Sequence, residues 1–242
     1  MSKDKSDITT PPAAPVSPRS EIDAFVAKVR SLGPATTAGQ RGRLVFALDA
    51  TMSRQPTWTR ATQIQSDMFG VAQDIGGLAV QLVYFRGHGE FRASDWTASP
   101  TVLANRMREV GCRSGFTQIC RVLAHAAAEA GQTKVGALVY VGDAFEEDPD
   151  AAAAEAGRLA LLGVPAFMFH EGDDPHAGAV FRDIARLTKG VYARFDSGAA
   201  KQLRDLLMAA AIYATGGAVA LREHARKKGG EFLRIADQME RK

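Results

Sequence analysis

Short apolar runs alternate with helical patterns through the middle of this sequence. Four of the runs are almost continuously apolar, which is typical of parallel strands covered on both faces, and they lie at 44–49, 78–85, 137–143 and 165–170. Apolar positions with helical spacing are found at about 59–75, 99–110, 117–130, 149–162 and 176–188. Parallel strands need crossover helices between them, so the alternation predicts an α/β fold with helices on both faces of a sheet.

Two segments depart from this alternation. In LVYFRGHGEFRASDW, Gly87 and Gly89 lie between two strand-like runs that leave no room for a helix, so we expect a hairpin that adds an antiparallel edge strand. A last strand is predicted at 191–195, followed by helix to the end of the chain with breaks near Gly216-Gly217 and Gly229-Gly230. The expected fold is a doubly wound, Rossmann-like three-layer sandwich whose central sheet is mostly parallel.

The two ends of the chain differ from this central region. Residues 1–18 contain four prolines and several Ser and Thr, a composition that buries too little apolar surface to fold, so we expect a disordered tail. A capping signal and an apolar face predict a short helix and a linker within 19–42. The main domain is expected at 43–213 and a helical extension at 214–242.

Composition places the chain among globular proteins, because 46% of its 242 residues are hydrophobic and 24% are charged. The formal net charge of +3 comes from the ends, since residues 44–221 carry 16 basic and 19 acidic side chains. Nucleic-acid-binding domains concentrate Lys and Arg on a folded face, so no nucleic-acid partner is expected. The longest apolar stretch, 206–221, falls short of the roughly 18 residues of a membrane span, and the N-terminus lacks an apolar export signal. We expect a cytoplasmic protein.

Side chains with oxygen atoms collect where the predicted strands end. The first strand is followed by Asp49, Thr51 and Ser53 at alternate positions. Asp143 ends a later strand, and Thr117 lies at the start of a predicted helix. Ligands of open α/β sheets bind at the carboxyl ends of the strands, and oxygen ligands suit the hard cations Mg²⁺ and Mn²⁺. These positions are therefore our candidates for a metal site.

The pattern resembles the metal-ion-dependent adhesion site (MIDAS) of the von Willebrand factor type A (vWA) family, found in integrin inserted domains and many bacterial cytoplasmic proteins. That family has Asp-x-Ser-x-Ser after the first strand, a Thr in a Gly-Gly-Thr turn before the third helix, and an Asp at the end of the fourth strand. The residues that match these positions are Asp49, Thr51, Ser53, Thr117 and Asp143. The resemblance covers about residues 43–208 and implies the vWA fold.

Two residues depart from the family pattern. Thr51 replaces the usual first Ser, which keeps the hydroxyl group and adds a methyl group. Phe116 replaces the second Gly of the Thr turn and can alter that turn or the access to the site. Neither change removes an oxygen ligand.

The resemblance implies a protein-interaction module rather than an enzyme. In the family, Asp, Ser and Thr hold Mg²⁺ directly or through water, and an open coordination position accepts a carboxylate from a partner. Mg²⁺ demands six oxygen ligands, so an outside acidic side chain can supply what the protein withholds. We therefore expect an adaptor or scaffold that binds an exposed acidic residue of a partner protein, and the bacterial relatives imply a chaperone-like or AAA+ ATPase as that partner.

A structural interpretation of the same residues remains open. Asp49 and Ser53 can cap the helix that follows them, and Thr117 can be an N-cap. Asp143 has no such role, because it closes an apolar strand and precedes further carboxylates. An uncompensated acidic cluster beside Asp49 would repel itself, and a divalent cation would relieve that repulsion.

The alternative function is an Mg²⁺-dependent phosphoryl-transfer enzyme of the haloacid-dehalogenase-like kind. Such enzymes resemble Asp-x-Asp at the end of the first strand, where the first Asp is the nucleophile. Here Thr51 takes the place of the second acid, and no lysine is placed in the equivalent role. The sequence also lacks a phosphate-binding P-loop, a dinucleotide fingerprint and a G-x-S-x-G nucleophile elbow, so we expect no enzyme activity.

Overall fold

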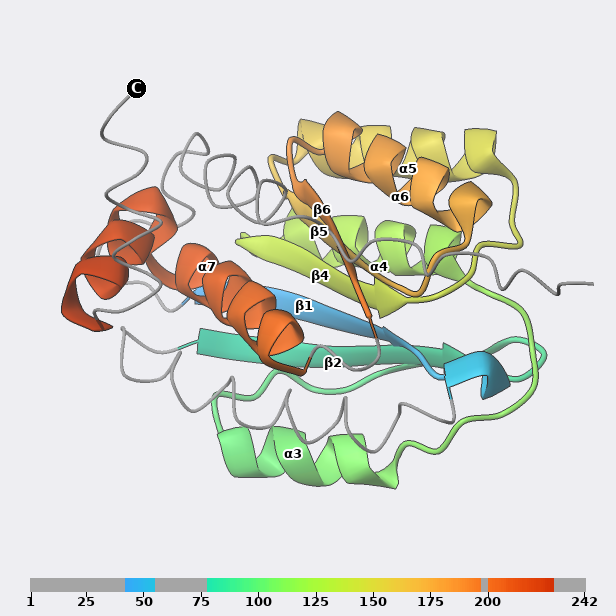
Figure 1. Ribbon diagram of the computed structural model, residues 1–242, viewed down its shortest axis with the longest axis horizontal. Coiled ribbons are helices and arrows are strands. Elements are labelled where there is room, and N and C mark those ends of the chain that lie inside the picture. The colour runs from blue at the N-terminus through green and yellow to red at the C-terminus, as the bar shows by residue number, and fades with distance from the viewer. Residues whose placement is uncertain (1–41, 55–77, 197–199, 229–242) are drawn as a thin grey trace, which may run out of the picture.

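The computed structural model describes residues 42–54, 78–196 and 200–228. One sheet has the strand order β3-β2-β1-β4-β5-β6 (Figure 1). Its strands are β1 (Gly42–Asp49), β2 (Leu78–Arg86), β3 (Glu90–Ala93), β4 (Ala137–Gly142), β5 (Ala166–Glu171) and β6 (Val191–Phe195). β3 pairs antiparallel with β2, and all other neighbours are parallel. The predicted mixed sheet with one antiparallel edge strand is confirmed.

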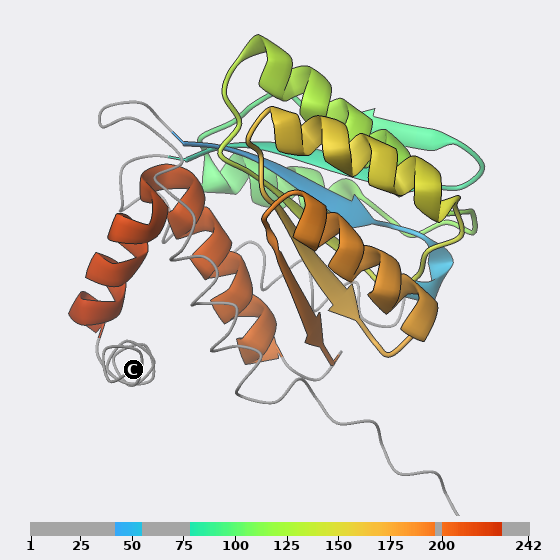
Figure 2. The ribbon, with the colours of Figure 1, turned by 90° about the horizontal axis from the view of Figure 1, so that it is seen from above.

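Helices cover both faces of this sheet, which confirms the three layers (Figures 1 and 2). They are η1 (Met52–Arg54), α3 (Pro100–Glu109), α4 (Ile119–Gln132), α5 (Pro149–Leu161), α6 (Pro175–Leu187) and α7 (Ala200–Lys228). Leu44, Phe46 and Leu48 of β1 belong to the core under α3 and α7. Val45 and Ala47 belong to the core under α4, α5 and α6. Alternate residues of a strand face opposite layers, so a central strand buried on both faces must be apolar throughout.

Local capping signals set the starts of three helices. Ser99, Asp148 and Asp174 precede α3, α5 and α6, and each accepts a hydrogen bond from a backbone N–H of the first turn. A proline follows each cap, and proline suits this place because the first N–H of a helix has no intrahelical acceptor. These helices begin and end within one residue of the sequence prediction.

The predicted hairpin joins β2 to β3. Arg86 is paired with Glu90, and the turn between them contains Gly87 and Gly89, both with positive φ. Glycine adopts this conformation without the steric cost that a Cβ brings. The hairpin brings its turn to the same edge of the sheet as the carboxyl end of β1.

Helix α7 spans the place where a break was predicted near Gly216-Gly217. It is one helix from Ala200 to Lys228, and residue 213 lies inside it. The helix changes direction between its two halves (Figure 2). Glycine lowers helix stability by only about 1 kcal/mol, which weakens a helix without ending it.

Several predicted segments lie outside the described residues, namely 1–18, nearly all of 19–42, and the helix at 59–75. Within the described part of the chain, no helix combines the length and the apolar character needed to cross a membrane.

Candidate functional site

The direction of the chain across the sheet reverses between β1 and β4. From β1 the chain continues to β2 and β3 on one side, whereas β4, β5 and β6 extend on the other. Loops that leave the carboxyl ends of β1 and β4 therefore run in opposite directions, and such a switch point is where open α/β sheets bind ligands. Leu48 is in register with Val141, so Asp49 and Asp143 leave the sheet on neighbouring strands.

Asp49 is buried and only partly satisfied by hydrogen bonds. Its Oδ1 accepts a hydrogen bond from the backbone N–H of Thr51 at 2.8 Å. Its Oδ2 is buried and has no hydrogen-bond partner among the described residues. The pKa of Asp49 is raised from 3.8 to about 6, mainly by burial and to a smaller extent by the charge of Asp143, although hydrogen bonds from Thr51 and the charge of Arg54 act in the opposite direction. The carboxylate therefore lies in a place that disfavours its charge.

Asp143, directly after β4, is in a similar position. Its Oδ1 is buried, again without a hydrogen-bond partner in the described part of the chain. Tyr140 lies near both carboxylates, and its pKa is raised well above 10 by burial first and then by the charges of Asp49 and Asp143. Two acidic groups thus meet at the switch point, and each has one oxygen atom that accepts no hydrogen bond from the residues that the structure describes.

Two hydroxyl groups accompany Asp49 on the loop after β1. The Oγ atoms of Thr51 and Ser53 lie 3.0 Å apart. Thr51 is buried and Ser53 is exposed, so the pair reaches from the acidic centre to the surface. The loop is fixed by backbone hydrogen bonds from Ala50 to Phe85 and from Arg113 to Ala50. The spacing in the sequence thus brings two hydroxyl oxygens to one place, as predicted from their alternate positions.

Thr117 is tied to the loop that follows Asp143. Its Oγ1 accepts a hydrogen bond from the backbone N–H of Glu146 at 2.9 Å, and its own N–H donates to Oε2 of Glu146 at 3.1 Å. Helix α4 begins at Ile119 with Gln118 as its N-cap, so Thr117 is not the cap of this helix. The hydroxyl oxygen keeps one lone pair beyond the bond to Glu146, which leaves it able to act as a ligand.

The carboxylates that follow Asp143 are satisfied by backbone N–H groups, which corrects the expected uncompensated cluster. Glu146 accepts from Thr117, and Glu147 accepts from the first two residues of α4. Asp148 caps α5. Free N–H groups and the helix dipole favour negative charge at a helix N-terminus, so these three side chains need no cation. The unsatisfied oxygen atoms of Asp49 and Asp143 remain.

A buried ion pair at the same edge was missed by the sequence analysis. Arg54, the last residue of η1, has a fully buried side chain whose Nε lies 2.8 Å from Oε2 of Glu171 at the end of β5. The signal for Glu171 is the one that identified Asp143, because both carboxylates directly follow an apolar strand. Arg54 directly follows Ser53, and no local pattern separates it from an exposed arginine.

Exposed apolar side chains lie on the two loops that carry the hydroxyl groups. Met52 is 50% exposed and Phe116 is 61% exposed. The Phe116 ring meets His88 edge-on, with ring centroids 5.6 Å apart. Gly115 packs so closely on the backbone of Gly87 that a Cβ would collide with it. The Phe116 turn is therefore held against the hairpin, and its aromatic ring lies at the surface.

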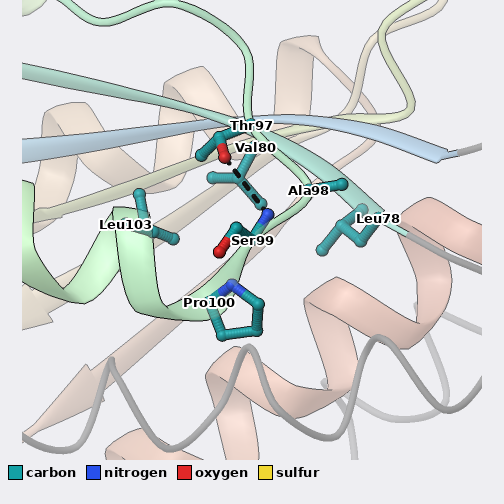
Figure 3. Close-up of a pocket in the computed structure, with 7 residues that line it drawn as sticks. All are labelled: Leu78, Val80, Thr97, Ala98, Ser99, Pro100 and Leu103. Carbon is teal, nitrogen blue, oxygen red and sulfur yellow. Dashed lines mark hydrogen bonds between the residues drawn. The ribbon is translucent and has the colours of Figure 1, made fainter.

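The depression shown in Figure 3 is separate from these residues. It lies between the start of β2 at Leu78 and the start of α3, where Ser99 and Leu103 line it. β2 runs parallel to β1, so its first residue is at the opposite edge of the sheet from Asp49. None of the described residues that line the depression is charged.

The donor set at the switch point fits a hard cation. The described residues contain no group of three or more His, Cys, Asp or Glu that could hold a metal ion. A cation here would instead use two carboxylates and up to three hydroxyl groups, from Asp49, Asp143, Thr51, Ser53 and Thr117. Oxygen donors of this kind suit Mg²⁺ and Mn²⁺, and the two unsatisfied carboxylate oxygens are the atoms that would gain most from such an ion.

Comparison with known proteins identifies the fold. No protein-family model matches the sequence, and no curated protein matches it. A von Willebrand factor type A protein from Catenulispora acidiphila matches in structure with a TM-score of 0.56 and 16% identity, over 72% of this chain and 43% of that one. The pilus adhesin SpaC from Lactobacillus rhamnosus GG matches with a TM-score of 0.59 and 13% identity, over 75% of this chain and 31% of that one.

A third structure is matched over almost its whole length. An aerotolerance-related membrane protein from Bacteroides fragilis has a TM-score of 0.53 and 18% identity, and the match covers 69% of this chain and 98% of that one. At these identities the likeness concerns the fold alone. The chain has a vWA-like fold.

Proposed function

We propose that this chain is a metal-dependent protein-interaction module, an adaptor or scaffold that binds an acidic residue of a partner through Mg²⁺ or Mn²⁺. The observation that carries the proposal is a pair of buried oxygens, Asp49 Oδ2 and Asp143 Oδ1, which have no hydrogen-bond partner among the described residues and lie at the ends of neighbouring strands at the switch point. An unsatisfied buried acceptor costs about 1–3 kcal/mol, and more when it is charged, which a bound cation would offset. The vWA-like fold and the likeness to a pilus adhesin support an interaction role.

Each residue of the set has a distinct part in this proposal. Asp49 and Asp143 supply the negative charge that attracts the cation. Thr51, Ser53 and Thr117 supply neutral oxygen atoms, directly or through water. With only two carboxylates from the protein, a bound ion would keep enough positive charge to accept an outside carboxylate at an open coordination position.

The surface around the site indicates the chemistry of the partner. Ser53 is the exposed member of the set, so the partner's carboxylate would approach on its side. Met52 is exposed on the loop that carries Ser53, and Phe116 is exposed on the loop that carries Thr117. Both would contact apolar side chains next to the partner's acidic residue. The vWA resemblance extends the proposal to a cytoplasmic partner, a chaperone-like or AAA+ ATPase.

Calorimetric titration with Mn²⁺ and Mg²⁺ tests the metal site. Asp49→Ala is expected to abolish binding while the protein stays folded, because the change also removes a carboxylate that is costly to bury. The matched control is Asp183→Ala, which removes an exposed carboxylate of α6 that pairs with Arg186. Unchanged metal affinity in Asp49→Ala, or equal loss in both variants, would reject the site.

Water-proton relaxation of the Mn²⁺-loaded protein tests the open coordination position. Bound Mn²⁺ with an exchanging water ligand enhances relaxation, and a carboxylate that displaces this water lowers the enhancement. Acetate and a short peptide with one Glu between apolar residues are expected to lower it, whereas the same peptide with Gln is not. An enhancement that no carboxylate affects would mean that the ion is structural.

The phosphoryl-transfer alternative would need a lysine near Asp49. Lys134 and Lys189 lie shortly before β4 and β6, at the edge of the sheet opposite to Asp49. Lys201 lies in the first turn of α7, which follows the carboxyl end of β6, and Lys227 and Lys228 end that helix. We expect no hydrolysis of phosphate esters in Mg²⁺, and a measurable turnover that Asp49→Ala abolishes would favour the enzyme.

A further inference from the structure

The buried ion pair of Arg54 and Glu171 connects the loop of the candidate metal site to a strand on the far side of β4. Arg54 ends η1, which follows β1, and Glu171 ends β5. The strand order places β4 between β1 and β5. The pair, with its 2.8 Å contact, thus spans the end of the strand after which Asp143 lies.

This ion pair is part of the same charge cluster as the two unsatisfied carboxylates. The Arg54 side chain is fully buried, and that of Glu171 is 8% exposed, so water screens neither charge well. Arg54 is close enough for its charge to act on Asp49 and on Tyr140. Three carboxylates and one guanidinium leave the ionised cluster with a net charge of −2, which one divalent cation would neutralise.

A guanidinium and a divalent ion compete for the same negative potential. Arginine stays charged at every physiological pH, so Arg54 is a permanent cation beside the acidic pair. Its charge repels an incoming metal ion but stabilises Asp49 and Asp143 when no ion is bound. Glu171, at the end of β5, attracts the guanidinium group of Arg54 toward that strand. It thereby weakens both the repulsion of a metal ion and the stabilisation of Asp49 and Asp143.

We propose that Arg54 is an internal cation that competes with the metal ion for Asp49 and Asp143, and that Glu171 sets the metal affinity by holding Arg54 to one side. This inference rests on the proposed metal site, whose regulation it describes. Arg54 and Glu171 are positioning residues here, since neither is a metal ligand.

Metal titration of single and double variants gives the first test. Glu171→Gln removes the negative charge that faces Arg54 at 2.8 Å, so more of the guanidinium charge acts on the acidic pair, and Mn²⁺ binding is expected to weaken by about tenfold or more. Arg54→Met removes the competitor and is expected to strengthen binding by a similar factor. The double variant restores the net charge of −2 and is expected to bind within about threefold of the unmodified protein. Arg158→Met, which breaks the exposed 2.9 Å pair with Glu155, is the matched control and is expected to change nothing.

A purely structural clamp gives a different pattern. If the pair only fixes the loop, both single variants weaken metal binding and the double variant weakens it as well, and this result overturns the proposal. Equal affinities in all variants overturn it too. If Arg54→Met does not fold, unchanged or stronger binding in Glu171→Gln still contradicts the competition.

A second test needs no metal and separates this inference from the metal site itself. In EDTA, urea unfolding is measured for Arg54→Met, Asp143→Asn and the double variant. Arg54→Met is expected to destabilise the protein strongly, and Asp143→Asn is expected to recover much of that loss, because the cluster then contains one charge fewer. Additive effects would show that Arg54 does not act on the acidic pair. The effects of Arg54→Met and Asp143→Asn in EDTA can be non-additive while the calorimetric titrations detect no metal binding. This result would reject the proposed function, and Arg54 would then be only the counter-ion of the acidic pair.

Discussion

Replacing Asp49 with Asn is expected to stabilise the metal-free protein, although it removes the main carboxylate of the site. Burial raises the pKa of Asp49 from its ordinary 3.8 to about 6. Between these values the folded protein binds more protons than the unfolded chain, so stability falls as the pH rises from about 4 to 6. The difference corresponds to roughly 3 kcal/mol of lost stability at pH 7 and above.

Asp49→Asn avoids the loss of stability that comes from burying an ionised carboxylate, and the hydrogen bonding that it gives up costs less than this loss. Its side-chain oxygen still accepts the hydrogen bond from the Thr51 N–H, which Asp49 Oδ1 accepts at 2.8 Å. Its amide nitrogen takes the place of the buried Oδ2, which has no partner among the described residues, and an unsatisfied donor costs about 1–2 kcal/mol. The net gain at pH 7.5 is therefore about 1–2 kcal/mol, or roughly 3–6 °C in Tm.

Thermal unfolding followed by circular dichroism, in EDTA and in Mg²⁺ from pH 5 to 8, measures these differences. In EDTA the variant is expected to exceed the wild type at pH 7.5 and to lose this advantage near pH 5. Mg²⁺ at a hundred times its Kd should stabilise the wild type by about 2.7 kcal/mol and leave the variant unchanged, which reverses their order. A wild type that is the more stable in EDTA at pH 7.5, with the same pH dependence as the variant, would refute the reasoning about Asp49.

Two further changes test the surroundings of the site. Thr117→Ala removes the acceptor of the Glu146 N–H and one proposed neutral ligand, so it should destabilise the protein by about 1 kcal/mol and weaken carboxylate-peptide binding more than Mn²⁺ binding. Calorimetry with both ligands measures this, and equal weakening would contradict it. Gly115→Ala places a Cβ against the backbone of Gly87, and urea unfolding should show a loss of at least about 1–3 kcal/mol, whereas an unchanged midpoint would mean that the hairpin moves freely away from the turn.

The architecture could be predicted from the sequence, because the signals for it are local. Apolar runs such as 44–49 and 137–143 indicate strands buried on both faces, and the structure has parallel strands at both places. Caps such as Asp148 and Asp174 fix the starts of helices within a few residues of chain. Asp49 and Asp143 both lie at the switch point, because β1 and β4 are neighbouring parallel strands whose carboxyl ends are at the same edge of the sheet. That these residues hold a metal remains a prediction.

Only the tertiary structure decided which charges at this edge are compensated. Glu146, Glu147 and Asp148 form one acidic run in the sequence, yet each meets backbone N–H groups of a turn or helix start. In the sequence, nothing distinguishes Arg54 from an exposed polar residue. In the structure, the strand order places Glu171 beside it, and the two form a buried ion pair. Periodicity and capping act over a few neighbouring residues, whereas burial and ion pairing depend on strands that the chain joins through long crossovers. The electrostatic character of the site therefore arises from packing, in which distant segments remove water from the same few charges.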